Sequence, residues 1–163
     1  NVDDKDSIQR IVEEIRGHVL ELVKDVNGNH VIQKCLSYFQ PAEVDFIYEE
    51  VISKCDEIAT HKHGCCVIQR CIDYCDEEQI KVLIRSIIDL TETLINDIYG
   101  NYVVQYILEL QGYEKEKEKM GQVMAKRIQY YCFQKFSSNV IEKALKVEII
   151  SVFESLIRVL ENP

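Results

Sequence analysis

The chain has 163 residues, of which 47% are hydrophobic and 29% charged, values typical of one soluble globular domain with a buried core. Its 28 acidic and 19 basic residues give a net charge of -9, which argues against binding nucleic acid through bulk positive charge. Seven cysteines, an odd number, favour a reducing compartment, and we expect a cytoplasmic protein. No apolar run approaches the roughly 20 residues that cross a bilayer, so no membrane span is expected.

The predicted elements are helices with short connections, because the chain holds only two Pro and six Gly and is rich in Ile, Leu, Glu and Lys. Residues 5–16 predict a first helix. A short helix at 18–25 follows, then a turn with Gly, a second helix at 29–38 and a third at 41–52. Pro41 occupies the first turn of this third helix, where proline is favoured.

The start of the second helix carries a sequence motif that recurs along the chain. Its sequence "GNHVIQK" (28–34) returns as "GCCVIQR" (64–70), "GNYVVQY" (100–106) and "SSNVIEK" (137–143), spaced by 36, 36 and 37 residues. Apolar columns keep the same register before and after the motif. A fixed period of this length is typical of stacked units that bury their apolar faces against their neighbours, so the sequence predicts an all-α solenoid.

The register also divides the chain. We expect repeats at 17–52, 53–88, 89–124 and 125–163, with 1–16 as the last helix of a preceding repeat. We therefore expect a fragment of a longer repeat protein, or one that needs a partner at its ends. The charged segment "YEKEKEKM" (113–120) is expected to be a solvated helix face or an extended loop.

Each motif holds two polar side chains four residues apart: Asn29 with Gln33, Cys65 with Gln69, Asn101 with Gln105, and Ser138 with Glu142. On a helix this spacing places both on one face, while the β-branched pair between them turns toward the core. Helix capping is an alternative, because Asn and Ser are favoured N-caps. A capping box needs three residues rather than four, and Cys65 is a poor cap.

A second column lies beside these pairs, at His30, Cys66, Tyr102 and Asn139. Flat rings beside hydrogen-bonding pairs, once per repeat, suit a ligand made of stacked rings with polar edges. Single-stranded RNA is such a ligand, and helical repeats that read one base each are known.

These motifs resemble the Pumilio (PUF) family of RNA-binding repeats over essentially the whole chain, in "RGHVLELVKDVNGNHVIQKCL", "THKHGCCVIQRCI", "IYGNYVVQYIL" and "QKFSSNVIEKAL". Their order resembles the fourth to seventh of the family's eight repeats. The resemblance implies a right-handed, crescent-shaped solenoid of three-helix repeats that binds mRNA 3′ untranslated regions. It further implies post-transcriptional regulation such as translation repression, with protein co-repressors as partners and no enzyme activity, cofactor or small-molecule substrate.

Hydrogen-bond chemistry then assigns bases. Two amides suit uracil, at Asn29/Gln33 and Asn101/Gln105; the carboxylate of Ser138/Glu142 suits guanine; and Cys65/Gln69 suits adenine. The family binds RNA antiparallel, which implies 5′-GUAU-3′ within a UGUA-type element. His30 and Tyr102 are expected to stack on bases, with Asn139 as a weaker platform. Cys66 departs from the family, which commonly has Arg there, so stacking near the adenine should be weaker.

Basic residues close to the motifs could allow RNA binding although the net charge of the chain is negative. Base-edge recognition needs fewer phosphate contacts than duplex binding, and a basic strip near the motifs is expected to supply them. Its candidate RNA-backbone residues are Lys34, Arg70, Lys143, Lys62 and Lys135. Many acidic residues fall instead on the third helices.

Three rival functions remain. His61, His63, Cys65, Cys66, Cys71 and Cys75 crowd together, but without the C-x-x-C spacing of a zinc knuckle, so no metal is expected. A Cys nucleophile with a His base lacks any oxyanion-hole signal. A protein-binding solenoid of the armadillo or HEAT kind is the main alternative, although it needs no matched polar pairs.

Overall fold

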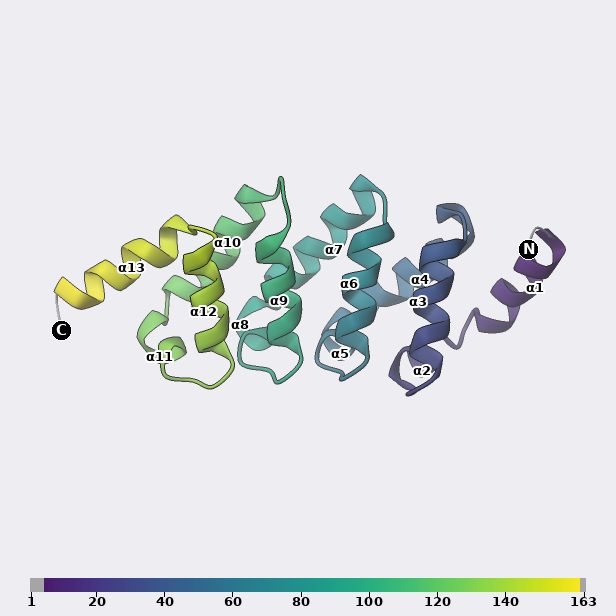
Figure 1. The fold of residues 1–163 in the computed structure, drawn as a ribbon, viewed down its shortest axis with the longest axis horizontal. Helices are drawn as coiled ribbons and strands as arrows, with labels where there is room; N and C mark the ends of the chain where they lie inside the picture. The colour runs from purple at the N-terminus through teal and green to yellow at the C-terminus, as the bar shows by residue number, and fades with distance from the viewer. Residues whose placement is uncertain (1–4, 162–163) are drawn as a thin grey trace. The chain divides into compact units, whose positions relative to one another are not determined.

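A computed structural model of the chain describes residues 5–161, and all regular elements in that range are helices (Figure 1). The predicted all-α repeat architecture is confirmed. The chain divides into two compact units, one ending at Leu83 and the other beginning at Ile84.

The first unit contains two successive groups of three helices after the opening helix. Its elements are α1 (Lys5–Ile15), α2 (Val19–Lys24), α3 (Gly28–Tyr38), α4 (Pro41–Ser53), α5 (Cys55–Ala59), α6 (Gly64–Tyr74) and the start of α7 (Glu77–Asp89). Helices α3 and α6 lie side by side, and α4 lies behind α3 (Figure 1). The first unit therefore presents two second helices on one face.

The second unit repeats this plan. After the end of α7 its elements are α8 (Thr91–Leu94), α9 (Gly100–Glu109), α10 (Glu114–Ala125), α11 (Ile128–Cys132), α12 (Ser137–Lys146) and α13 (Ile150–Glu161). Helices α9 and α12 lie side by side, while α10 packs against α13 (Figure 1). The second unit thus also presents two second helices together.

The helix boundaries follow local signals that the sequence carries. Pro41 is the first residue of α4, as predicted, and the Glu43 carboxylate accepts the Gln40 backbone N–H at 2.8 Å, which caps the helix start. Helix α3 begins at Gly28, one residue before the predicted start. The charged segment is not an extended loop, because its residues 114–120 belong to α10, and Lys117 in it is buried at 8% exposure.

The core of each unit is aliphatic. In the first unit Ile32, Ile47, Ile58 and Ile68 have no exposed surface. In the second unit the same holds for Leu94, Val104, Ile107 and Met124, and Tyr131 is buried with them. Each such side chain stabilises the fold by about 1.5–3 kcal/mol through burial, so the second helices are held firmly against the helices behind them.

Glycine at the start of the second helix allows its close approach to the first helix of the same repeat. A Cβ atom on Gly64 would lie 2.2 Å from the carbonyl oxygen of Ile58, and one on Gly28 would lie 2.8 Å from that of Leu22. In the fourth repeat the equivalent residue is Ser137, which is fully buried and donates its Oγ hydrogen to the Tyr131 carbonyl at 3.0 Å. A hydroxyl there turns the close contact into a hydrogen bond.

We therefore expect Gly64→Ala to destabilise the protein by about 2 kcal/mol, because the added methyl group meets backbone that cannot move aside. Urea denaturation measures the change. The matched control is Gly100→Ala, where the nearest atom is the side-chain Cδ2 of Leu94 at 2.8 Å, so its loss should be clearly smaller. Equal losses in the two variants would contradict this account of the glycine column.

Candidate RNA-binding surface

The two Asn/Gln pairs have the same geometry, one in each unit. Asn29 is 3% exposed, and its Nδ2 donates to the carbonyls of Asp25 at 2.8 Å and Val26 at 2.9 Å. Its Oδ1 accepts a hydrogen bond from Gln33 Nε2 at 2.9 Å. In the second unit Asn101 makes the equivalent bonds, including one from Gln105 Nε2 at 2.9 Å. In both pairs the buried asparagine therefore fixes the glutamine side chain by a hydrogen bond, and the glutamine is the half-buried residue at the surface.

This geometry shows that the capping alternative is wrong for these asparagines, because they donate to carbonyls instead of accepting from backbone N–H groups. The backbone N–H groups at these helix starts are accepted instead by two aspartates in the preceding turns, which the sequence reasoning missed. Asp25 Oδ1 accepts the N–H of Gly28 at 2.7 Å, and Asp97 Oδ1 accepts that of Gly100 at the same distance. The Gly28 N–H bond, followed by that of Asn27, lowers the pKa of Asp25. The D-x-x-G pattern at each site could have revealed them.

The Cys65/Gln69 pair differs from the Asn/Gln pairs. Cys65 is 4% exposed and its Sγ lies 3.4 Å from the Lys62 carbonyl, while burial and then the neighbouring Cys66 thiol raise its pKa to about 12. Cys65 is therefore a neutral, inward thiol. Among residues 5–161 no hydrogen bond holds the Gln69 amide, so this amide can turn about its last bond.

The Ser138/Glu142 pair is the most exposed of the four. Ser138 Oγ lies 3.5 Å from the Lys135 carbonyl, a weak contact, and Glu142 Oε1 pairs with Lys146 Nζ at 2.6 Å. The Lys146 hydrogen bond lowers the pKa of Glu142. The carboxylate therefore stays ionised near neutral pH and can only accept hydrogen bonds.

The expected stacking column is exposed in all four repeats, at His30, Cys66, Tyr102 and Asn139, with Tyr102 at 57%. The β-branched residues beside it are buried in three repeats. In the first repeat Val31 is 45% exposed, so the expectation that both members of each pair face the core is wrong there. Val31 instead borders an apolar groove with Ile8 and Ile11 of α1.

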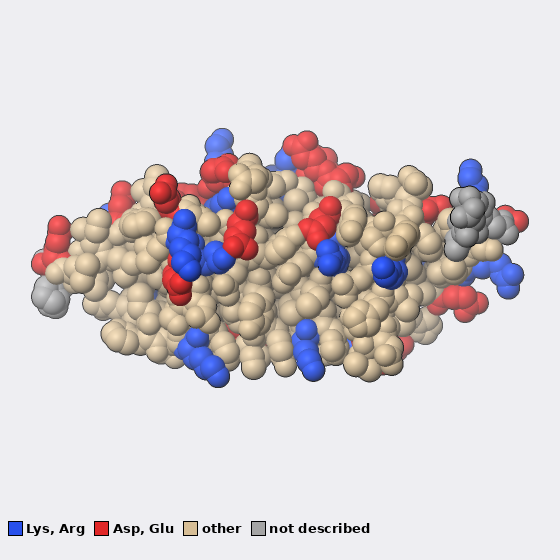
Figure 2. Space-filling view, viewed as in Figure 1, with Lys and Arg blue, Asp and Glu red and all other residues tan. Residues whose placement is uncertain are grey.

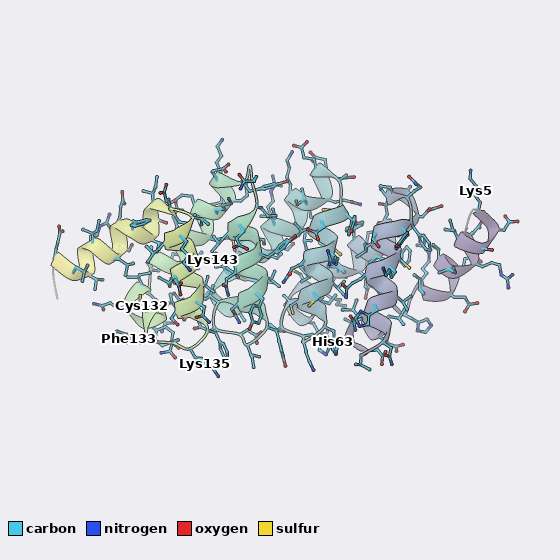
Figure 3. All side chains as sticks on the ribbon, in the orientation of Figure 1. Lys5, His63, Cys132, Phe133, Lys135 and Lys143 are labelled. Carbon is cyan, nitrogen blue, oxygen red and sulfur yellow. The ribbon has the colours of Figure 1, made fainter. Side chains whose placement is uncertain are left out.

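The basic residues expected to form a strip are partly neutralised by acidic neighbours. Arg70 pairs with Asp73 at 3.0 Å, and Lys143 pairs with Glu109. The Lys34 ammonium lies 5.2 Å from the centre of the Tyr38 ring. Figure 2 shows a largely uncharged surface with adjacent basic and acidic side chains. Figure 3 places Lys143 on α12 and Lys135 at the lower edge of the same unit. Lys62 and Lys135 are both exposed.

The cysteine and histidine cluster separates in space. Cys71 is fully buried and Cys66 is exposed, while the His61 and His63 rings lie with centroids 5.7 Å apart. Within residues 5–161 no group of three or more His, Cys, Asp or Glu side chains is arranged to hold a metal ion. No helix in the same range has the length and apolar character needed to cross a membrane.

The fold and the repeated surface define a helical-repeat protein with one polar pair on the second helix of each repeat. A sequence profile described as the Pumilio-family RNA binding repeat matches residues 18–52, 54–88, 93–120 and 128–147. The chain belongs to the Pumilio family, as the motifs predicted.

Known proteins of the family resemble this chain in sequence and in structure. "Pumilio homology domain family member 4" of Saccharomyces cerevisiae is 41% identical over 147 residues, which cover 88% of this chain and 16% of that protein. The Puf4 RNA-binding domain bound to the HO endonuclease RNA 3′ UTR recognition sequence superposes with a TM-score of 0.88 at 38% identity, over 99% of this chain and 50% of that one. The RNA-binding domain of yeast Puf5p bound to SMX2 RNA gives 0.82 at 34% identity, over 93% and 45%.

Proposed function

We propose that the chain binds single-stranded RNA in a sequence-dependent way, one base to each repeat, with 5′-GUAU-3′ as its preferred tetranucleotide. The observation that carries this proposal is the identical Asn–Gln geometry at Asn29/Gln33 and Asn101/Gln105, set beside two differently built pairs. The RNA-bound relatives of similar fold support it.

The locked Gln amide explains a preference for uracil. Asn29 fixes which side of the Gln33 amide carries the nitrogen, which leaves the Gln33 oxygen and one N–H for a ligand. The uracil edge offers an N–H donor beside a carbonyl acceptor, and one fixed amide can meet both. The asparagine then acts as a positioning residue, because both of its N–H groups are already used and its side chain is buried.

The other two pairs fit different bases. Adenine also offers a donor beside an acceptor, but in the opposite order relative to the ring, and the Gln69 amide can turn to match it because Cys65 does not hold it. Guanine offers two adjacent N–H donors, which the ionised Glu142 carboxylate accepts together. An acceptor-only carboxylate would leave a uracil carbonyl without a donor.

The biological role that we propose is regulation of mRNAs that carry UGUA-type elements in their 3′ untranslated regions, with protein co-repressors as further partners. Base-edge and stacking contacts would supply most of the affinity, since the surface carries few unpaired basic groups.

Fluorescence anisotropy with a labelled RNA containing UGUAU, beside a shuffled RNA of equal composition, tests this function. We expect at least about ten-fold tighter binding to UGUAU, since each well-placed contact to a base contributes on the order of 1 kcal/mol or more. Weak and equal binding to both RNAs would favour a protein-binding scaffold of the armadillo or HEAT kind instead.

A further inference from the structure

A small polar cavity lies between α3 and α6 in the first unit. Its volume is about 260 Å³, and it is lined by His30, Gln33, Lys34, Ser37, Arg70 and Tyr74. Four of these residues belong to the candidate RNA-binding surface: His30 and Gln33 are expected to contact a base, and Lys34 and Arg70 are expected to contact the RNA backbone. The cavity therefore opens directly beside a reading position.

The equivalent place in the second unit holds an internal ion pair. There Lys143 of α12 pairs with Glu109 of α9, across the gap between two neighbouring second helices. In the repeat register Lys143 corresponds to Arg70, and Glu109 corresponds to Ser37. In the second unit the positive charge of Lys143 is thus neutralised by Glu109 on the facing helix.

In the first unit the cation is kept and the facing acid is replaced by a hydroxyl. Ser37 Oγ donates to the Lys34 carbonyl at 3.0 Å and offers no charge to Arg70. Arg70 pairs through Nη1 with Asp73, which lies on its own helix and not across the gap, and Arg70 remains half-exposed at 51%. A guanidinium carries five N–H donors, and this one pair uses only part of them.

The charges at this position therefore favour an external anion. Lys34 and Arg70 bring two positive charges to the lining, against the single acid Asp73. Arginine suits a phosphate because its planar fork of donors matches two phosphate oxygens at once. Tyr74, at 43% exposure, adds a ring at the rim of the cavity.

We propose that this cavity binds one phosphodiester group of the bound RNA, the one linking the adenine to the uracil that follows it. The assignment of that linkage rests on the proposed function, because Cys65/Gln69 and Asn29/Gln33 are the two reading pairs that flank the cavity. The phosphate takes the place that the Glu109 carboxylate holds in the second unit.

The test is to close the cavity by substitution. Ser37→Glu would supply the missing acid opposite Arg70, and Ser37→Gln is its uncharged control of matched size. We expect Ser37→Glu to weaken binding to UGUAU RNA by about five-fold at low salt, with the slope of log affinity against log salt smaller by about 0.7. The Ser37→Gln variant should bind within about two-fold of the unchanged protein. Equal weakening in both variants, or an unchanged slope, would overturn the proposal.

Two further arms identify the source of the phosphate and guard against misfolding. An RNA with a neutral methylphosphonate at the adenine–uracil linkage should bind the unchanged protein as weakly as ordinary RNA binds the Ser37→Glu variant. If instead inorganic phosphate competes with RNA while the neutral linkage has no effect, the cavity is a free-phosphate site and the RNA assignment is wrong. Arg70→Gln should lower the slope by a similar amount, about 0.7, and adding Ser37→Glu to it should lower it no further.

These outcomes separate the cavity from the proposed function. If the unchanged protein does not prefer UGUAU, the base assignments fail first. If it prefers UGUAU and Ser37→Glu binds equally well, only the phosphate proposal fails. Arg85→Gln, at an exposed position on α7, controls for the simple loss of one positive charge.

Discussion

Combined replacement of Ser138 by Asn and Glu142 by Gln is expected to change the preferred base at that repeat from guanine to uracil. The backbone there can accept the new amide, because Ser138 Oγ already lies against the Lys135 carbonyl and the Ser138 backbone N–H donates to the Gln134 carbonyl. These two carbonyls correspond to those of Asp25 and Val26, which hold Asn29. The change should therefore rebuild the locked amide pair.

The expected size of this change is about 1–3 kcal/mol in each direction, or roughly ten- to hundred-fold in affinity for the two RNAs. Dissociation constants for GUAU and UUAU RNAs measure it, with the other three bases unchanged. The control is Glu142→Gln alone, which removes the carboxylate without the holding asparagine and should lose guanine preference without a full gain for uracil. A double variant that still prefers guanine would show that this pair does not read the base.

Removal of the Tyr102 ring is the second large expected effect. Tyr102→Ala should weaken RNA binding by about 1–3 kcal/mol, since stacking of a base on an aromatic ring contributes that much in single-strand binders. The ring is 57% exposed, so the free energy of unfolding should change little. Anisotropy gives the affinity, and thermal denaturation shows that the fold is kept.

The matched control for this variant is Phe133→Ala. Phe133 is 87% exposed in the same unit but lies outside the stacking column. It should therefore leave RNA affinity unchanged. If both variants bind as the unchanged protein does, Tyr102 does not stack on RNA. If both weaken binding equally, the loss reflects general surface hydrophobicity.

The fold was predictable from the sequence because the same signals return at a fixed spacing. Each second helix begins beside a small residue, Gly28, Gly64, Gly100 or Ser137, that permits close packing on the preceding helix. The start of α4 at Pro41 was equally visible. These signals depend on only a few neighbouring residues, so short stretches of the sequence reveal them. Their return in each repeat then supports the assignment.

The site was predicted less completely, because its hydrogen bonds depend on tertiary geometry. The four-residue spacing correctly placed Gln33 beside Asn29. It could not show that the Asn29 amino group turns inward to two carbonyls, since that requires the turn which the Asp25 carboxylate fixes. Nor could the spacing reveal that Glu109 faces Lys143 across two helices. Contacts between neighbouring repeats involve residues about one period apart, where sequence alone gives no pairing rule.

We propose that each repeat reads one base, in the order guanine, uracil, adenine, uracil. The most direct measurement is the affinity of the protein for GUAU RNA and for every single-base variant of it, at one salt concentration. We expect GUAU to bind most tightly, and a change at any one position to weaken binding independently of the others, by roughly ten-fold or more. A set of affinities that does not depend on base identity would contradict it.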